Sequence, residues 1–219
     1  MEVFSTIVGF FQEGGVFMYP IVIVLALGMA IAIERWLYLT ATTVKNKAIW
    51  NKITPHLKAG NFSNAVQITG KSKAAIATIL SYGLSRVRSS RRREDVESAM
   101  EESLMEVMPQ LEKRTHYLAT FANIATLLGL LGTIIGLIRA FTAVSNANPA
   151  EKADLLSASI SVAMNTTAFG LMVAIPLLLI HTLLQTKTTA IVDSLEMASV
   201  KFLNALTEHS EAKPAQAAG

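Results

Sequence analysis

The side chains in this sequence that could take part in chemistry are hydroxyl groups set among small residues in two long uncharged segments. In the first segment these residues are spaced by four, three, four, three and four positions, which places them on one face of a helix. They are Ala122, Thr126, Gly129, Thr133, Gly136 and Ala140. The second segment has a similar face, made of Ser159, Ala163, Thr166, Gly170 and Ala174, with Thr167 beside it. Hydroxyl oxygens on two such faces could line a polar seam or pore between helices.

The two faces also permit a simpler interpretation, the close packing of helices. Small residues let membrane helices approach one another, and a threonine can satisfy its hydroxyl on the backbone of its own helix. Threonine alone is therefore weak evidence for a pore. Four threonines on two matching faces favour pore lining, and both interpretations remain open from the residues alone.

The groups that catalysis requires are missing from this sequence. The uncharged segments contain no carboxylate, and His181 lies near one end of the longest of them. A lone histidine there is more often an interfacial residue than a proton relay. Without cysteine, a phosphate-binding loop, a metal triad or a nucleophile–base pair, we expect no enzyme activity, no catalytic residue, no metal site and no cofactor. If the protein moves ions, a partner must supply the charged group that carries them.

Three uncharged segments determine the fold class. Residues 14–33, 115–138 and 155–186 contain 20, 24 and 32 residues, and about 20 apolar residues suffice for a helix to cross a bilayer. The chain has 219 residues, of which 52% are hydrophobic and 16% charged. Too little polar chain remains to cover three buried helices in a soluble protein. The sequence therefore predicts an all-α membrane protein with three transmembrane helices that extend into a cytoplasmic helical domain.

The basic residues indicate the orientation of the chain. Residues 1–13 hold two glutamates and no base, whereas residues 45–93 hold eleven bases and no acid. The positive-inside rule places the N-terminus outside and the C-terminus in the cytoplasm. The predicted parts are an outer N-terminal segment (1–13), a first transmembrane helix (14–39), a cytoplasmic helical domain (40–114), a second transmembrane helix (115–143), an outer loop (144–154), a third transmembrane helix (155–186), and a cytoplasmic C-terminal helix with a disordered tail (187–219). Within this last part, the disordered tail is expected to begin after about Thr207.

Within the cytoplasmic domain the sequence predicts helices at residues 45–58 and 63–88. The second of these should contain a turn at Gly70 and begin at a cap formed by Asn61 or Ser63, because both side chains can accept a hydrogen bond from the first turn of a helix.

An acidic amphipathic helix is expected over residues 94–112, where apolar residues recur every three or four positions. We expect it to continue unbroken into the second transmembrane helix, with a bend at Pro109. The basic run before it could bind anionic lipid, pair with acidic helices of neighbouring subunits, or only fix the topology. No recognition motif supports nucleic-acid binding.

Three runs of residues resemble a known family. LEKRTHYLATFANIATLLGLLGTIIGLIRAF (111–141) is similar to the hallmark of the MotA/TolQ/ExbB ion-channel family, and ISVAMNTTAFGLMVAIP (160–176) resembles its second signature. Residues 14–39 are similar to its first span. The resemblance covers nearly the whole chain. Because one span precedes the cytoplasmic domain, in place of two, the TolQ/ExbB branch is the more similar.

The resemblance implies a multi-pass subunit of the bacterial inner membrane that forms a homopentameric ring, with its N-terminus in the periplasm. It also implies a single-span partner of the ExbD/TolR type with an intramembrane Asp, and a further TonB/TolA-like partner. Ion flow would then couple the proton motive force to mechanical work on the cell envelope. The alternatives are a sodium-driven version of the same motor and, in another class, a non-conducting membrane scaffold that clamps a partner helix.

The residues expected along the ion pathway come from two sources. The resemblance implies Thr133 and Thr167, which are also the possible ligands of a sodium ion. The helical faces add Thr126, Asn165 and Thr166.

The sequence departs from the family pattern at three positions. Many members of the TolQ/ExbB branch carry a glutamate where Val162 stands, which argues against a proton-relay role for this chain. Many also have a proline at the position of Thr126. Arg139, near the outer end of the second span, could snorkel to the interface or attract an acidic group of a partner.

Overall fold

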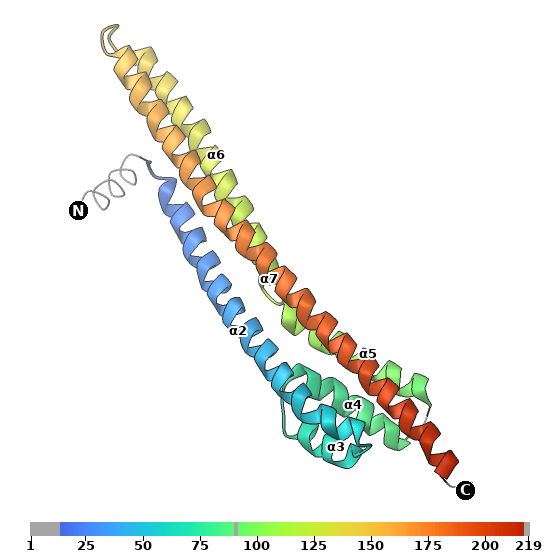
Figure 1. Ribbon diagram of the computed structural model, residues 1–219. Coiled ribbons are helices and arrows are strands. Elements are labelled where there is room, and N and C mark those ends of the chain that lie inside the picture. The colour runs from blue at the N-terminus through green and yellow to red at the C-terminus, as the bar shows by residue number, and fades with distance from the viewer. Residues whose placement is uncertain (1–13, 90–91, 217–219) are drawn as a thin grey trace, which may run out of the picture. The chain divides into compact units, whose positions relative to one another are not determined.

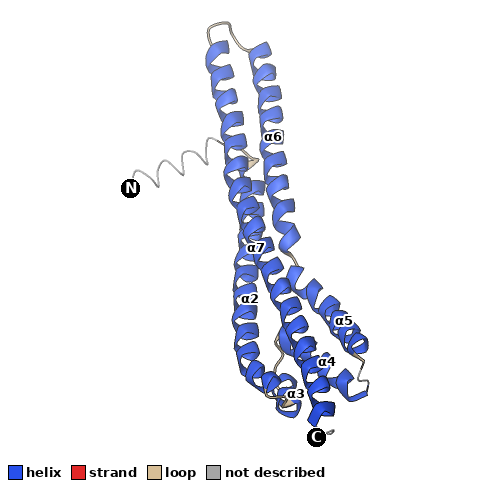
Figure 2. Cartoon of the chain, turned by 45° about the vertical axis from the view of Figure 1, so that its right-hand side comes forward, coloured by secondary structure: helices blue, strands red, loops and turns tan. Residues whose placement is uncertain are grey.

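The computed structural model describes residues 14–89 and 92–216, and all the regular structure in these ranges is helical. The helices, labelled in Figure 1, are α2 (Met18–Lys58), α3 (Phe62–Gly70), α4 (Ala75–Ser89), α5 (Arg93–Glu112), α6 (Thr115–Asn146) and α7 (Lys152–Gln216). Figure 2 shows the same helices coloured by secondary structure. The predicted outer segment, residues 1–13, lies outside the described residues.

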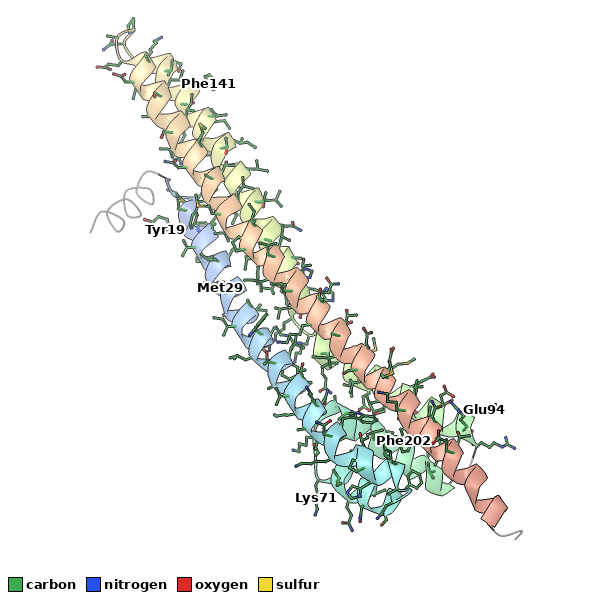
Figure 3. All side chains as sticks on the ribbon, in the orientation of Figure 1. Tyr19, Met29, Lys71, Glu94, Phe141 and Phe202 are labelled. Carbon is green, nitrogen blue, oxygen red and sulfur yellow. The ribbon has the colours of Figure 1, made fainter. Side chains whose placement is uncertain are left out.

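Three helices, α2, α6 and α7, are long and apolar enough to cross a membrane. Between 22% and 28% of the residues in their most apolar windows are buried inside the chain, so most of these side chains face outward. Tyr19, Met29 and Phe141 are examples of large exposed side chains on these helices (Figure 3). Apolar side chains exposed on long helices suit lipid surroundings. The predicted all-α membrane protein with three spans is confirmed.

The chain forms two compact units, and α2 and α7 each contribute to both. In its described part, the first unit consists of residues 14–35 and 114–183. It therefore contains the start of α2, the whole of α6 and the first half of α7. In its described part, the second unit consists of residues 36–89, 92–113 and 184–216, with α3, α4 and α5 as its complete helices.

The first unit depends on close approach of the backbones of α6 and α7. A Cβ atom added at Gly170 would lie 2.7 Å from the carbonyl oxygen of Ala125 and 3.1 Å from the Cα atom of Gly129. One added at Gly136 would lie 2.8 Å from the Cβ atom of Ala163. The two small faces read from the sequence therefore pack against each other within one chain, as small residues do between membrane helices.

The second unit has its own apolar core. Its buried side chains come from all five helices that enter it, and they include Ile53, Ile79, Leu80, Leu84, Met100 and Phe202. Phe62 and Phe202 pack edge to face, with ring centroids 6.5 Å apart. The predicted cap of α3 is confirmed at Asn61, whose side chain accepts from the backbone N–H of Asn64 over 3.3 Å.

The predicted unbroken helix from the acidic segment into the second span is wrong. Helix α5 ends at Glu112, Arg114 has a φ of 64°, and α6 begins at Thr115. Pro109 has no N–H to donate to the preceding turn, which weakens the ladder of hydrogen bonds there. The break also coincides with the boundary between the two units, at Lys113 and Arg114.

The disordered tail predicted after Thr207 is also wrong over most of its length, because α7 continues to Gln216. The segment contains few apolar residues, which suggested disorder. However, Ala, Glu, Lys and Gln are good helix formers, and a helix that already exists is extended without a new nucleation step. The connection between the second and third spans is shorter than the predicted loop (144–154), since only residues 147–151 lie between α6 and α7.

We predict that Gly170→Ala destabilises the protein by about 1–3 kcal/mol, as overpacking of a close contact does. The new methyl group would meet the backbone atoms of Ala125 and Gly129, which cannot rotate away. Gly28→Ala is the matched control, because its methyl group would meet the side chain of Leu177, which can change rotamer. Equilibrium unfolding of both variants in detergent, followed by circular dichroism, measures the difference. Equal losses would contradict a backbone contact at Gly170.

Candidate functional site: the threonine cluster of helices α6 and α7

Thr133 of α6 and Thr167 of α7 bring their hydroxyl oxygens into direct contact. The Thr133 hydroxyl also lies 3.2 Å from the carbonyl oxygen of Gly129 and 3.4 Å from that of Ala163. The Thr167 hydroxyl donates to the carbonyl oxygen of Gly129 over 2.9 Å. We call these four groups, two hydroxyls and two carbonyls, the threonine cluster. The structure thus brings together the two residues that the family resemblance implied.

The glycines of the two helices make this cluster possible. A Cβ atom at Gly129 would lie 3.3 Å from the Cα atom of Thr167, so a larger residue there would push α7 away from α6. At the observed distance, Thr167 reaches a carbonyl of the neighbouring helix in place of one on its own. Close packing and the gathering of hydroxyl oxygens are therefore consequences of the same contact.

The cluster offers oxygen lone pairs to a ligand. Each hydroxyl has one hydrogen to donate and two lone pairs that can accept. Because Thr167 donates its hydrogen to the carbonyl of Gly129, Thr133 can donate its own hydrogen to Thr167 or to a carbonyl. In either case the two hydroxyl oxygens keep lone pairs that can accept. Thr133 and Thr167 are both half-buried, so they are not sealed inside the chain. An oxygen-rich group of this kind suits a hard cation, a water molecule or a protonated carboxyl group.

Thr166 lies next to the cluster in sequence but has different partners. Its side chain is only 2% exposed, and its hydroxyl lies 2.6 Å from the carbonyl oxygen of Gly14 and 2.9 Å from that of Val162. The first of these contacts ties the chain just before α2 to α7. Sequence reasoning missed this contact, because a periodic pattern reports which face a residue occupies and not which distant backbone group it meets.

The remaining two residues of the predicted pathway, Thr126 and Asn165, do not belong to the threonine cluster. The hydroxyl of Thr126 donates to the carbonyl oxygen of Ala122 on its own helix over 3.1 Å, and Thr126 precedes Thr133 by two turns, about 10 Å along α6. Asn165 is half-buried on α7. Their part in an ion pathway stays a prediction.

A pocket of about 200 Å³ adjoins Thr166 in the first unit. Its lining includes Arg139, Ser159 and Val162, and among the residues that the structure describes no carboxylate lines it. Val162 packs near Gly15, which has a φ of +72°. Val162 therefore faces a cavity whose lining includes its own apolar side chain and Arg139.

Ionisable groups gather where α6 begins. Arg114 donates to Glu34 over 3.1 Å, with both side chains about half exposed. His116 lies beside His181, with ring centroids 6.5 Å apart. A charged pair and two imidazoles near the first turn of α6 fit the interfacial interpretation of His181. Within residues 14–89 and 92–216, no group of three or more His, Cys, Asp or Glu side chains is placed to hold a metal ion.

Comparison with known proteins places this site in a wider group. Residues 71–197, which include the threonine cluster, match the MotA/TolQ/ExbB proton channel family. The chain is 30% identical over 196 residues to a putative biopolymer transport protein ExbB homolog of Methanothermobacter thermautotrophicus, a match that covers 89% of this chain and 68% of the relative.

Two shorter matches point the same way. The chain is 34% identical over 93 residues to the Tol-Pal system protein TolQ of Haemophilus influenzae, which covers 42% of this chain and 40% of the relative. It is 38% identical over 73 residues to the biopolymer transport protein exbB1 of Vibrio cholerae, which covers 33% and 32%.

Proposed function

Because the chain belongs to the TolQ/ExbB branch of the MotA/TolQ/ExbB proton channel family, we propose that it is the ion-conducting subunit of an inner-membrane motor. In this proposal the motor couples the proton motive force to mechanical work on the cell envelope. The observation that carries the proposal is the threonine cluster, which places Thr133 and Thr167 in contact within the family-matched region. The N-terminus lies in the periplasm and the C-terminus in the cytoplasm.

The charged group of the pathway comes from a partner. The three uncharged segments of this chain contain no Asp or Glu, so the carboxylate that carries the ion belongs to a single-span ExbD/TolR-like protein. When that carboxyl group is protonated, the hydroxyls of Thr133 and Thr167 can accept its hydrogen bond or hold a water molecule beside it. A TonB/TolA-like protein then receives the mechanical work. Thr126, Asn165 and Thr166 extend the pathway along the two helices.

The same structure supports a second candidate, a non-conducting scaffold that clamps a partner helix. The hydrogen bonds from Thr133 and Thr167 to backbone carbonyls fasten α6 to α7, and that role needs no ion. The two candidates differ in whether the hydroxyl oxygens are needed after assembly.

The threonine hydroxyls provide the test. We expect Thr133→Val and Thr167→Val each to reduce ion flux by about tenfold or more, because each deletes an oxygen that contacts a charged group while the side-chain shape is kept. Flux is measured in liposomes that contain the purified complex with its single-span partner. Serine at either position should retain partial flux. Thr120→Val, on the same helix but with its hydroxyl on its own backbone, is the control.

Two outcomes would go against this assignment. Full flux in both valine variants, at normal expression, would remove Thr133 and Thr167 from the pathway. An assembled wild-type complex without flux would favour the scaffold.

The coupling ion is proposed to be the proton, with sodium as the alternative. A proton needs a titratable group or a chain of water, which a partner carboxylate can supply. Sodium needs several oxygen ligands in place of its hydration shell, for which Thr133 and Thr167 are the candidates. We expect activity in cells to persist when sodium is replaced by potassium at constant pH, and to be lost on addition of a protonophore. Loss on sodium removal alone would identify the sodium-driven version.

The assembled state is proposed to be a homopentamer that encloses the partner helices. In a single chain the two hydroxyls are hydrogen-bonded to each other and to backbone carbonyls, but Thr133 and Thr167 are only half-buried. Lipid cannot use the acceptor capacity that their oxygens retain, whereas a ring places protein or water beside them. Native mass spectrometry in mild detergent should find a pentamer as the dominant species. A dominant monomer would be incompatible with this arrangement.

A further inference from the structure

A second pocket, of about 210 Å³, lies in the second unit among α2, the start of α4 and α5. The residues that give it chemical character are Lys45, Asn46, Lys73 and Glu106. None of them belongs to the threonine cluster or to the proposed ion pathway.

Asn46 is the most informative of these residues. It is only 5% exposed, and its Oδ1 atom accepts from the backbone N–H of Ile76 over 3.3 Å. That bond fixes the orientation of the amide, because the reversed amide would point its own N–H groups at a donor. The Nδ2 atom is buried and has no hydrogen-bond partner among the residues that the structure describes. A buried donor without an acceptor costs about 1–3 kcal/mol, so a ligand that supplies an acceptor to Nδ2 would be favoured here.

The start of α4 adds further donor character to the same pocket. Helix α4 has 15 residues, and Ala74 and Ala75 at its start line the pocket. The first N–H groups of a helix have no carbonyl partner within it. The side chains of Ser72 and Asn46 accept from two of them, those of Ala74 and Ile76. These two N–H groups are therefore not available to a ligand. Because Ala74 and Ala75 line the pocket, the positive end of the helix dipole still lies at it and favours an anion.

The charges of the lining select the kind of anion. The ammonium groups of Lys45 and Lys73 and the carboxylate of Glu106 give the lining a formal net charge of +1. A phosphodiester carries a single negative charge and matches this value. A free phosphate monoester carries about −1.5 to −2 at neutral pH, so Glu106 disfavours it.

We propose that this pocket binds a phosphate ester group, and that its source is the headgroup of a phospholipid in the inner leaflet. Asn46 donates to a phosphate oxygen from Nδ2, and Lys45 and Lys73 supply the compensating charge. Two further lining residues, Tyr38 and Thr42, lie at the end of the first predicted span (14–39) and directly after it. This places the pocket at headgroup depth and rests on the proposed topology. In this proposal, basic residues of the segment 45–93 bind a specific lipid and also help to fix the orientation of the chain in the membrane.

The test compares two double variants of equal charge in the full-length protein. Lys45→Gln with Lys73→Gln removes both ammonium groups of the pocket. Lys47→Gln with Lys71→Gln removes two exposed ammonium groups from the same segments outside the lining, and Figure 3 labels Lys71 at the turn between α3 and α4. Native mass spectrometry in detergent with added phosphatidylglycerol should show about tenfold weaker lipid binding for the first pair. The second pair should bind as the wild type does.

A third variant removes the donor without removing a lysine. Asn46→Asp keeps the oxygen that accepts from Ile76 and replaces the donating amide by an acceptor that repels phosphate. We expect it to lose the bound lipid as the first double variant does. Circular dichroism and gel filtration confirm that it folds.

A soluble arm identifies the source of the phosphate. Glycerophosphoglycerol, the soluble phosphodiester left when phosphatidylglycerol loses its acyl chains, is titrated into the wild-type protein in detergent, with the melting temperature as the readout. No shift, together with selective lipid loss in the first double variant, supports the headgroup. A shift that Lys45→Gln with Lys73→Gln abolishes keeps the phosphate site but assigns it to a soluble ligand. The proposal is overturned if both double variants bind lipid equally well or lose it equally. The lipid-binding measurements do not depend on ion flux. A failure of the lipid proposal can therefore be distinguished from a failure of the proposed function.

Discussion

The structure of the first unit depends on the contact between the backbones of α6 and α7 at Gly129 and Gly170. No side chain separates the helices at this point, and Thr167 therefore reaches a carbonyl on the other helix. From sequence, packing and pore lining are competing interpretations of the small faces. The geometry is compatible with both roles at once, because glycine and alanine make the contact between the helices while the threonine hydroxyls gather at its edge. Changing a glycine here would move the oxygens as well as the helices.

The second unit depends on a different interaction, the burial of apolar side chains of α3, α4 and α5 in a core that parts of α2 and α7 complete. Its core side chains are sealed, whereas the span helices present most of their apolar residues outward. The transition between α5 and α6 falls at the boundary between the two units. Arg114 leaves the helical conformation there, and its side chain pairs with Glu34.

A feature of this molecule can be predicted from the sequence when it depends on residues close together in the chain. A feature that depends on residues far apart in the chain cannot. The three spans, the ends of α3 and the cap at Asn61 follow from composition, periodicity and one side chain, and the structure agrees. The family motifs imply that Thr133 and Thr167 both line an ion path, and spacing places each on a helical face. Neither signal joins the two residues, and their contact is seen only in the structure. The bond from Thr166 to Gly14 and the break at Arg114 depend on chain far away in sequence or on the limits of a packed unit. No local pattern encodes them.

The geometry of the cluster bears on the coupling ion. Of its four oxygens, the carbonyl of Gly129 already accepts the hydrogen of Thr167, and the hydrogen of Thr133 goes to Thr167 or to a carbonyl. The free lone pairs of the two hydroxyl oxygens are therefore the ready acceptors of one chain. A dehydrated sodium ion requires several oxygens at once to replace its water, so one cluster is insufficient unless neighbouring chains or the partner complete the shell. A proton on a partner carboxyl group needs only one acceptor, or a water molecule held by one. The structure of a single chain therefore suits proton transfer beside the cluster better than coordination of sodium within it.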